Sequence, residues 1–448
     1  MQTALHIGCA AGFSGDRTDG ASAVVDTLIA RGGGTLIFET LAERTLALAQ
    51  LARDRDPQAG YEPLLDELVG PVLGRCVAHG IRIVSNFGAA NPAGAARRIA
   101  QLAREQGLPA PRIAVIEGDA LDAPHQRALL RERLGASFYD SLDIVSATAY
   151  LGAGQIAQAL QAGAQIVVAG RVADPSLAVG PALAHFGWSL DDWDRLGRAT
   201  IAGHLLECGL QVTGGYFCVP GLKEVPDLHA AGYPVLSLQA DGAMEIGKAD
   251  GTGGCVDLRT VKEQLLYEVH DPARYLTPDV VADLSQARAV QTGPDRVQVH
   301  GVRGHPRPDE LKVNLCHRGG WLAEAEISYA GLQAEARARL AGEIVRKRIG
   351  PALALRLDLI GVTSVLDDDA GSLAAARGPG DARDVRLRVA ASHADRALAE
   401  RVLREVTALY TCGPAGGGGV RTALRPRLNM VSCTIAREAV PARWTMLD

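Results

Sequence analysis

The chain carries its clearest fold signal in Ile166-Val167-Val168-Ala169-Gly170-Arg171-Val172-Ala173-Asp174-Pro175. The first four residues are an apolar run of strand length, and the run stops at a glycine, which is typical of a turn. Asp174 and Pro175 then stand where a helix cap and a first helical residue are expected, before a helix that reaches Phe186. The stretch predicts a strand, a polar loop and a helix in succession.

The same pattern recurs along the first half of the chain. Short apolar runs end near Gly, Asn, Asp or Ser at 5–9, 34–38, 81–86 and 113–117. Between them lie Ala-, Leu- and Arg-rich stretches of helical periodicity, such as 93–105 and 155–162. Repeated β-α units with buried strands form a parallel sheet whose ligand site lies beyond the carboxyl ends of the strands. We therefore expect an α/β fold with a mostly parallel sheet and helices on both faces.

Later segments follow other patterns. After Tyr216, Pro and Gly punctuate short segments, and near the end a strand, a helix and a further strand follow the split β-α-β pattern. We expect an α/β main domain at 1–217, a mixed α/β region packed on it at 218–350, a linker region at 351–384 and a small C-terminal α+β domain at 385–448.

Composition restricts the partners and the compartment. The 448 residues carry a formal net charge of −5 without a long basic block, which excludes nucleic acid as an expected partner. No stretch approaches the ~20 apolar residues that cross a bilayer, so we expect no membrane association. The eight cysteines are widely spaced without a Cys-x-x-Cys pair, which favours reduced thiols and a cytoplasmic protein.

A helical segment near residue 204 combines apolar and proton-handling residues. Ile201, Leu205 and Cys208 form an apolar stripe, whereas His204 and Glu207 lie on its flank. We interpret His204 as a general acid/base that Glu207 orients. The alternative is a boundary histidine bonded to backbone beside a solvated glutamate. Cys208 fits a small buried apolar residue better than a nucleophile.

A Thr-Gly-Gly turn follows that helix. Its backbone amides could face a ligand, and those of Gly214 could stabilise an enolate oxygen. The substrate-binding residues expected there are Thr213, Gly214, Gly215 and Tyr216.

Loops after the predicted strands hold further candidates. The first has glycines at 8, 12 and 15, which is not the Gly-x-Gly-x-x-Gly spacing of a dinucleotide site. Asp16 and Arg17 in this loop are candidates for substrate binding, with Arg17 a fork for carboxylate or phosphate; the alternative is an ion pair at the rim of a turn. Asn91 suits a helix cap before Pro92 and is a second-choice contact, whereas Asn86 has no local structural role and is expected to orient a substrate carbonyl.

Charged residues in other loops complete this set. Arg171 lies at the end of a strand beside a helix N-terminus, an arrangement suited to an anion. Asp174 is either a helix cap or a substrate contact. Asp119 or Glu43 could supply a second catalytic carboxylate.

A predicted helix at 260–271 places Glu263, Tyr267 and His270 on one stripe. Three proton-handling groups suggest acid/base chemistry, although a solvated polar face has the same pattern. No His-Glu-x-x-His, Gly-x-Ser-x-Gly or acidic metal-binding loop occurs, and the glycine-rich stretch 413–419 lacks the Lys-Ser/Thr of a P-loop. No metal site is expected.

Several motifs along the chain occur together in one known pattern. They include Gly12-Phe13-Ser14-Gly15-Asp16-Arg17, Gly170-Arg171-Val172-Ala173-Asp174, Gly203-His204-Leu205-Leu206-Glu207-Cys208, Val212-Thr213-Gly214-Gly215-Tyr216-Phe217 and His270-Asp271-Pro272. With these motifs the chain resembles the acyclic terpene utilisation family named for AtuA. The resemblance covers about the first 350 residues, and from about Asp384 the chain looks like that family's small ferredoxin-fold module, so the resemblance implies a ferredoxin-like C-terminal domain. Members occur with branched-chain acyl-CoA and terpenoid catabolic enzymes.

The combined hypothesis is a cytoplasmic, homo-oligomeric enzyme that acts on a small carboxylic acid or acyl-CoA thioester. We expect a lyase of the hydratase type that needs no redox cofactor. Two alternatives stay open: a non-catalytic scaffold of an acyl-CoA pathway, and a nucleotide- or metal-dependent enzyme.

Overall fold

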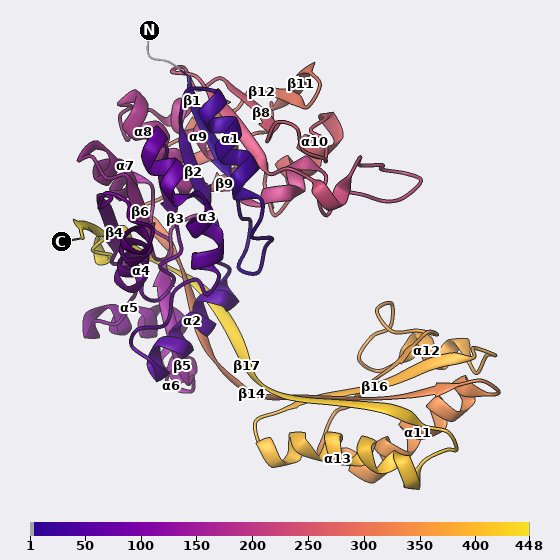
Figure 1. Ribbon diagram of the computed structural model, residues 1–448. Helices are drawn as coiled ribbons and strands as arrows, with labels where there is room; N and C mark the ends of the chain where they lie inside the picture. Colours follow the sequence, from indigo (N-terminus) through magenta and orange to yellow (C-terminus); the bar gives the residue numbers. More distant parts are fainter. Residues whose placement is uncertain (1–3, 448) are drawn as a thin grey trace. The chain divides into compact units, whose positions relative to one another are not determined.

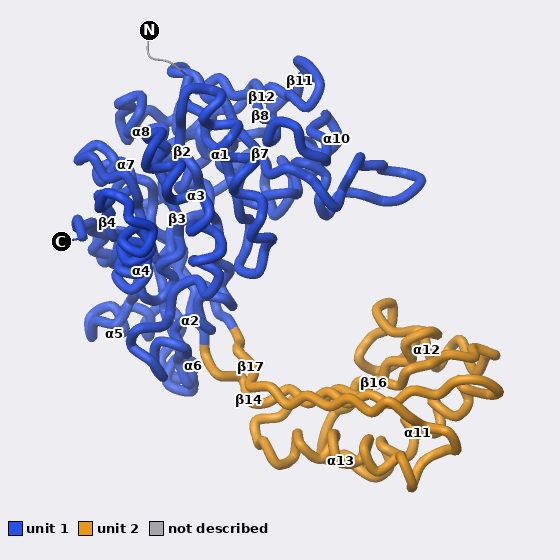
Figure 2. The backbone as a smooth tube through the Cα atoms, viewed as in Figure 1, with its two compact units in different colours: residues 1–316, 430–448 blue, residues 317–429 orange. Residues whose placement is uncertain are grey.

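The structure is a computed structural model that describes residues 4–447. Two compact units divide it: residues 1–316 with 430–448 form unit 1, and residues 317–429 form unit 2 (Figure 2). These divisions fall at other positions than the expected 217, 350 and 384. The reason is that two long strands, β14 (Glu310–Ala330) and β17 (Gly418–Ala436), each run across a division.

Unit 1 contains a ten-stranded sheet in the order β11-β12-β8-β7-β1-β2-β3-β6-β4-β18. Its parallel centre consists of β1 (Leu5–Cys9), β2 (Thr35–Phe38), β3 (Arg82–Ser85), β6 (Ile166–Ala169) and β4 (Ile113–Glu117). Each of these strands lies within one of the predicted apolar runs. The α/β prediction is therefore confirmed.

The sheet is mixed, so the prediction of a mostly parallel sheet is wrong. On both sides of the parallel centre, strands from later parts of the chain join by antiparallel pairing. These outer strands are β7 (Pro234–Leu238), β8 (Met244–Lys248), β12 (Arg296–His300) and β11 (Arg288–Gly293) on one side and β18 (Arg443–Met446) on the other. The expected second region thus extends the first sheet.

Helices cover both faces of the parallel centre (Figure 1). Successive residues of β2 alternate between two apolar clusters, with Leu36 and Phe38 in one and Ile37 in the other. Burial on both faces explains why these strands are continuous apolar runs in the sequence. The first cluster includes residues of α1 (Ala21–Ala30), α3 (Leu65–His79) and α4 (Pro92–Glu105), and the second includes residues of α7 (Gly154–Gln161), α8 (Ser176–Phe186) and α9 (Trp193–Glu207).

The remaining elements of unit 1 surround this sheet. A three-stranded sheet runs in the order β13-β10-β9, and β5 pairs with β14. The bounds are β5 (Ile144–Ala149), β9 (Tyr275–Leu276), β10 (Val281–Asp283), β13 (Arg303–His305), α2 (Glu43–Arg55), α5 (Pro124–Leu134), α6 (Ala136–Asp140) and α10 (Leu258–Leu266).

Unit 2 has its own apolar core. The sheet order is β15-β16-β14-β17, with β15 (Arg356–Ile360) and β16 (Asp384–His393) between the helices in sequence. Residues of α11 (Ala334–Ile349) and α13 (Arg396–Cys412) share one cluster with inward residues of the strands, and a short α12 (Ser372–Arg377) lies in the β15–β16 connection. The expected strand and helix near 385–409 therefore fall in β16 and α13.

All eight cysteines are free thiols, as their spacing predicts. They range from buried Cys9 and Cys76 to exposed Cys412. Within residues 4–447, none of the helices combines the length and apolar character that crossing a bilayer requires.

Candidate functional site

A cavity of about 960 Å³ opens in unit 1. Residues that follow β1, β2 and β6 line it, so it lies beyond the carboxyl ends of the parallel strands, where open α/β sheets bind their ligands. The last turns of α9 and the start of β14 complete the wall.

The cavity brings together about half of the predicted site residues. Lining it are Asp16, Glu43, Arg171, Asp174, His204, Glu207, Gly215, Tyr216 and Tyr267. Lying outside its wall are Arg17, Asn86, Asn91, Asp119, Thr213, Gly214, Glu263 and His270.

His204 and Glu207 form a buried pair on α9. His204 Nδ1 lies 2.8 Å from Glu207 Oε1, and the residues are 1% and 8% exposed. Among the described residues, His204 Nε2 and Glu207 Oε2 have no hydrogen-bond partner. The alternative of a solvated glutamate is therefore wrong.

Burial sets the charge of this pair. It lowers the pKa of His204 to about 4, so the imidazole is neutral near pH 7. Burial, and after it the nearby carboxylates of Asp174 and Glu268, raise the pKa of Glu207 well above its ordinary value. A neutral imidazole beside a carboxyl of raised pKa can take part in proton transfer.

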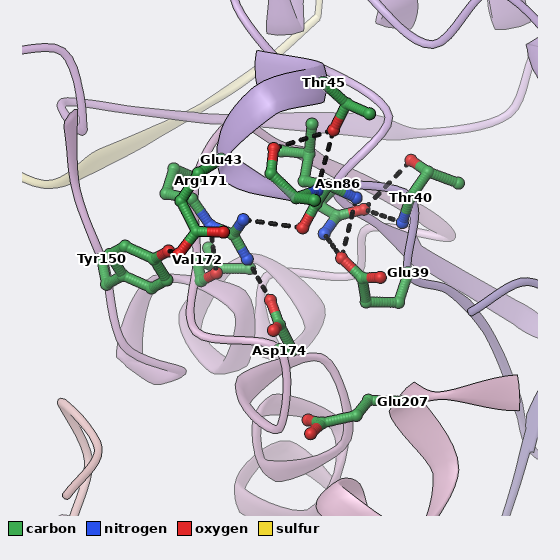
Figure 3. Close-up of polar contacts among 12 residues, drawn as sticks. Glu39, Thr40, Glu43, Thr45, Asn86, Tyr150, Arg171, Val172, Asp174 and Glu207 are labelled. Atoms are coloured by element: carbon green, nitrogen blue, oxygen red, sulfur yellow. Dashed lines mark hydrogen bonds and ion pairs between the residues drawn. The ribbon is translucent and has the colours of Figure 1, made fainter. Parts of the chain in front are cut away.

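Arg171 organises the loops around the cavity. Its side chain is 1% exposed, donates from Nε to Val172 O at 3.0 Å and from Nη1 to Leu41 O at 2.7 Å, and pairs with Asp174 (Figure 3). The guanidinium carbon lies 4.5 Å from the centre of the Tyr150 ring. Burial acts to lower the pKa of Arg171, but the surrounding acids raise it overall. The cation is thus held by protein groups on several sides.

Asp174 pairs with Arg171 and does not cap α8. The helix begins at Ser176 behind Pro175, without a side-chain cap. The capping interpretation of Asp174 is therefore wrong, although Asn91 does cap α4 by accepting from Gly94 N at 3.0 Å.

The pKa of Glu43 is shifted in the opposite direction to that of Glu207. Its Oε1 accepts from Tyr150 Oη at 2.6 Å and from Lys312 Nζ at 3.3 Å. Burial acts to raise the pKa of Glu43, but these donors and nearby Arg171 lower it to about 2. One cavity therefore holds two glutamates whose pKa values are shifted in opposite directions.

Asn86 lies behind the cavity wall and is fully buried. It donates from Nδ2 to Glu39 Oε1 at 2.8 Å, and its Oδ1 accepts from Thr40 N at 2.8 Å (Figure 3). The expected contact of Asn86 with a substrate is thus replaced by a contact with Glu39, which itself lines the cavity.

Arg17 and Asp119 have structural contacts outside the cavity wall, and Asp16, which lines the cavity, binds backbone amides of its own loop. Arg17 pairs with Asp19 at 2.9 Å rather than with Asp16, which instead accepts from Gly12 N and Arg17 N, both at 2.8 Å. Asp119 accepts from Arg171 N at 2.8 Å, and burial raises its pKa to about 6.

The Thr-Gly-Gly turn contributes its second half to the cavity. Thr213 is fully buried and donates from its hydroxyl to Leu210 O at 3.1 Å. Gly214 adopts φ 109° with Val225 packed against it, which leaves Gly215 and Tyr216 to line the cavity.

The predicted helix at 260–271 is shorter than expected, because α10 ends at Leu266 and Glu268 takes a left-handed φ of 57°. Glu263 therefore pairs with Lys223, Tyr267 turns toward the cavity and His270 is exposed. The prediction of one stripe of three proton-handling groups is wrong.

Further residues of the cavity were missed from the sequence. Glu39 directly follows β2, so the rule that sites follow strands could have found it, whereas Tyr150 directly follows β5, a strand that was not predicted from the sequence. Lys312, Tyr275 and Glu268 carry no comparable local signal. Within residues 4–447, no group of three or more His, Cys, Asp or Glu side chains is arranged to hold a metal ion.

Comparison with known proteins gives one match. The model of the family described as Acyclic terpene utilisation family protein AtuA matches residues 5–446. Neither the curated proteins nor the solved structures contain a match to the chain. The family match spans both units and includes the segments whose motifs carry the resemblance. The chain therefore belongs to the acyclic terpene utilisation family of AtuA.

Proposed function

We propose that this chain is an acid–base enzyme of acyclic terpene catabolism, a hydro-lyase that adds water to, or removes it from, a branched terpenoid acid or its acyl-CoA thioester. The observation that carries the proposal is the buried His204–Glu207 pair, whose Nε2 and Oε2 are unpartnered beside the cavity.

Addition of water to a double bond conjugated with an acyl carbonyl needs two proton transfers. The water oxygen bonds to the carbon distal to the carbonyl, and a proton is added to the carbon next to the carbonyl. Neutral His204 can accept the proton of the attacking water through Nε2, while its Nδ1–H donates to Glu207 Oε1 and so keeps the imidazole in the tautomer that can accept. Opposed pKa shifts such as those of Glu207 and Glu43 are typical of sites that assign acid and base roles to carboxyls.

The walls of the cavity also suit such a substrate. Leu41, Leu210 and Leu311 line it and offer apolar surface to a hydrocarbon chain. Arg274 is exposed at the cavity, and no hydrogen bond or ion pair engages its guanidinium among the described residues. Arg274 can therefore bind the anionic end of the substrate, the role first expected of Arg17.

Substitution of His204 tests this function. We expect His204→Ala to lower kcat by ~100-fold or more, because it removes the proton acceptor. The assay follows the absorbance of the conjugated thioester as water adds, with a series of branched enoyl-CoA substrates. His270→Ala is the matched control, since His270 is exposed outside the cavity. Wild-type turnover by a folded His204→Ala variant would refute the proposal, and a folded wild type that turns over none of these substrates would favour a scaffold.

The proposal extends to unit 2, which we assign as a ferredoxin-like module. Support comes from its element order β14-α11-β15-β16-α13-β17, a β-α-β-β-α-β succession. A cytoplasmic location is proposed on the eight free thiols, which suit a reducing compartment.

A further inference from the structure

We propose that Glu39 is a second proton-carrying catalytic residue of this cavity and that Asn86 positions it. This inference rests on the proposed function and adds the group that supplies the second proton. The sequence patterns predicted a substrate contact for Asn86 and no role for Glu39, so the roles of these two residues come from the structure.

The position of Glu39 fits a catalytic group. It directly follows β2, a central strand of the parallel sheet, and lines the cavity although only 5% of it is exposed. Its backbone N–H donates to Ala11 O at 3.1 Å, which ties the residue to the neighbouring loop after β1. A residue that is fixed in this way at the carboxyl end of a central strand has little freedom to move.

Only one oxygen of the Glu39 carboxyl is occupied. Oε1 accepts from Leu41 N and from Asn86 Nδ2, each at 2.8 Å, whereas Oε2 makes no hydrogen bond to any residue within 4–447. The free oxygen is therefore available to a ligand in the cavity.

Asn86 is itself held in one orientation. Its Oδ1 accepts from Thr40 N at 2.8 Å and from Thr40 Oγ1 at 3.2 Å, so the amide must present Nδ2 to Glu39. Fully buried, Asn86 makes these contacts away from the cavity. This is the arrangement of a positioning residue rather than of a substrate contact.

Glu39 also lacks a counter-ion. Among residues 4–447 no ion pair involves it, and Arg171 is bound to Asp174 and to two backbone carbonyls. Burial first, and then the negative charge of Asp174, raise the pKa of Glu39 well above its usual range, although the charge of Arg171 acts to lower it. The raised pKa favours the protonated form of Glu39, which can release its proton to a substrate.

The proposed step is balanced. The proton of Glu39 passes to the carbon next to the acyl carbonyl as the water oxygen bonds to the next carbon, and the water gives its own proton to His204. Glu39 is left as carboxylate and His204 as imidazolium. Exchange of one proton with solvent restores both groups, so the net change is the addition of one water.

The first measurement reads the proton without any substrate. In an infrared difference spectrum between wild type and Glu39→Gln at pH 7, we expect a band of a protonated carboxyl. Asn86→Ala should shift that band to higher frequency, since the carboxyl oxygen loses a hydrogen bond. Absence of the band from the wild type would overturn the inference.

The second measurement reads catalysis. We expect Glu39→Gln to lower kcat by ~100-fold with KM changed less than threefold, and Asn86→Ala to lower kcat by ~10-fold. Glu335→Gln is the matched control, because Glu335 is a buried glutamate, 2% exposed, that belongs to unit 2 and does not line the cavity. A band in the infrared with full activity of Glu39→Gln would also overturn the catalytic role.

These readouts separate the inference from the proposed function. If no branched enoyl substrate reacts with the wild type, the hydro-lyase proposal fails, whereas the infrared band still reports whether Glu39 holds a proton. If Glu39→Gln does not fold, Asn86→Ala carries the test through its band shift and its kcat.

Discussion

Replacement of Arg171 by methionine should destabilise unit 1 strongly. Arg171 is 1% exposed and donates to Val172 O, Leu41 O and Asp174. Methionine keeps the length of the side chain but cannot donate a hydrogen bond. Two backbone carbonyls and one carboxylate would therefore lose their partner at once.

The size of the effect follows from those contacts. A hydrogen bond from a charged donor contributes about 1.5 kcal/mol net, so the two carbonyl bonds account for about 3 kcal/mol. The Asp174 side chain is 36% exposed, and solvent screening reduces the contribution of the ion pair to about 1 kcal/mol. The sum of about 4 kcal/mol matches the usual cost of breaking a buried pair, and it corresponds to a melting temperature lowered by roughly 8 °C.

Calorimetry of matched variants provides the assay. Arg131→Met is the control, because Arg131 and its partner Asp140 have side chains 50% and 53% exposed, and such a surface pair contributes little to stability. A change below 2 °C for Arg171→Met would refute this account. It would then favour the first interpretation of Arg171 as a residue kept free for a substrate anion.

Two further perturbations test the core around the site. Burial raises the pKa of Asp119 to about 6. The protonated carboxyl therefore stabilises the fold below about pH 4, and this contribution is lost as the pH rises through 6. Relative to Asp119→Asn, the free energy of unfolding of the wild type, measured by urea titration, should fall by up to about 3 kcal/mol between pH 4 and pH 7. A difference in the free energy of unfolding between wild type and Asp119→Asn that stays constant from pH 4 to pH 7 would contradict this prediction. A Cβ on Gly304 would lie 1.6 Å from Trp193 O, whereas a Cβ on Gly154 would have no neighbouring heavy atom within 4 Å. Thermal melts should therefore show that Gly304→Ala lowers the melting temperature and that Gly154→Ala leaves it unchanged or raises it. Equal melting temperatures of the two variants would contradict the packing around β13.

Continuous apolar runs made the parallel centre predictable. Strands buried on both faces show no alternation, and their short length separates them from helices. β14 was missed because its alternation is interrupted by Gly319-Gly320, and without β14 the C-terminal module was expected to begin only at residue 385. The pairing of β18 with β4 joins segments that are distant in sequence, and no local pattern indicates it.

The site was predictable where one helix or one loop carries it. His204 and Glu207 are one turn apart, so the sequence alone places them together. Arg17 was misinterpreted because the carbonyls of His229 and Ala231, which hold its guanidinium at 3.3 Å, lie in a different part of the chain. The burial of Asn86 behind Glu39 likewise depends on tertiary contacts between two loops. The sequence indicates only that Glu39 follows the strand that ends at Phe38.

The antiparallel pairing of β18 with β4 has a consequence for biosynthesis. Arg443 and Glu117, which face each other in this pairing, are 326 residues apart. At translation speeds of 5–20 residues per second, synthesis of the residues between β4 and β18 takes roughly 15 to 65 s, so β4 lacks this neighbour for that time. During that interval the nascent chain exposes an unpaired strand edge, the feature that most readily recruits other chains into aggregates. In newly made protein the edge of β4 therefore stays unpaired until β18 has emerged.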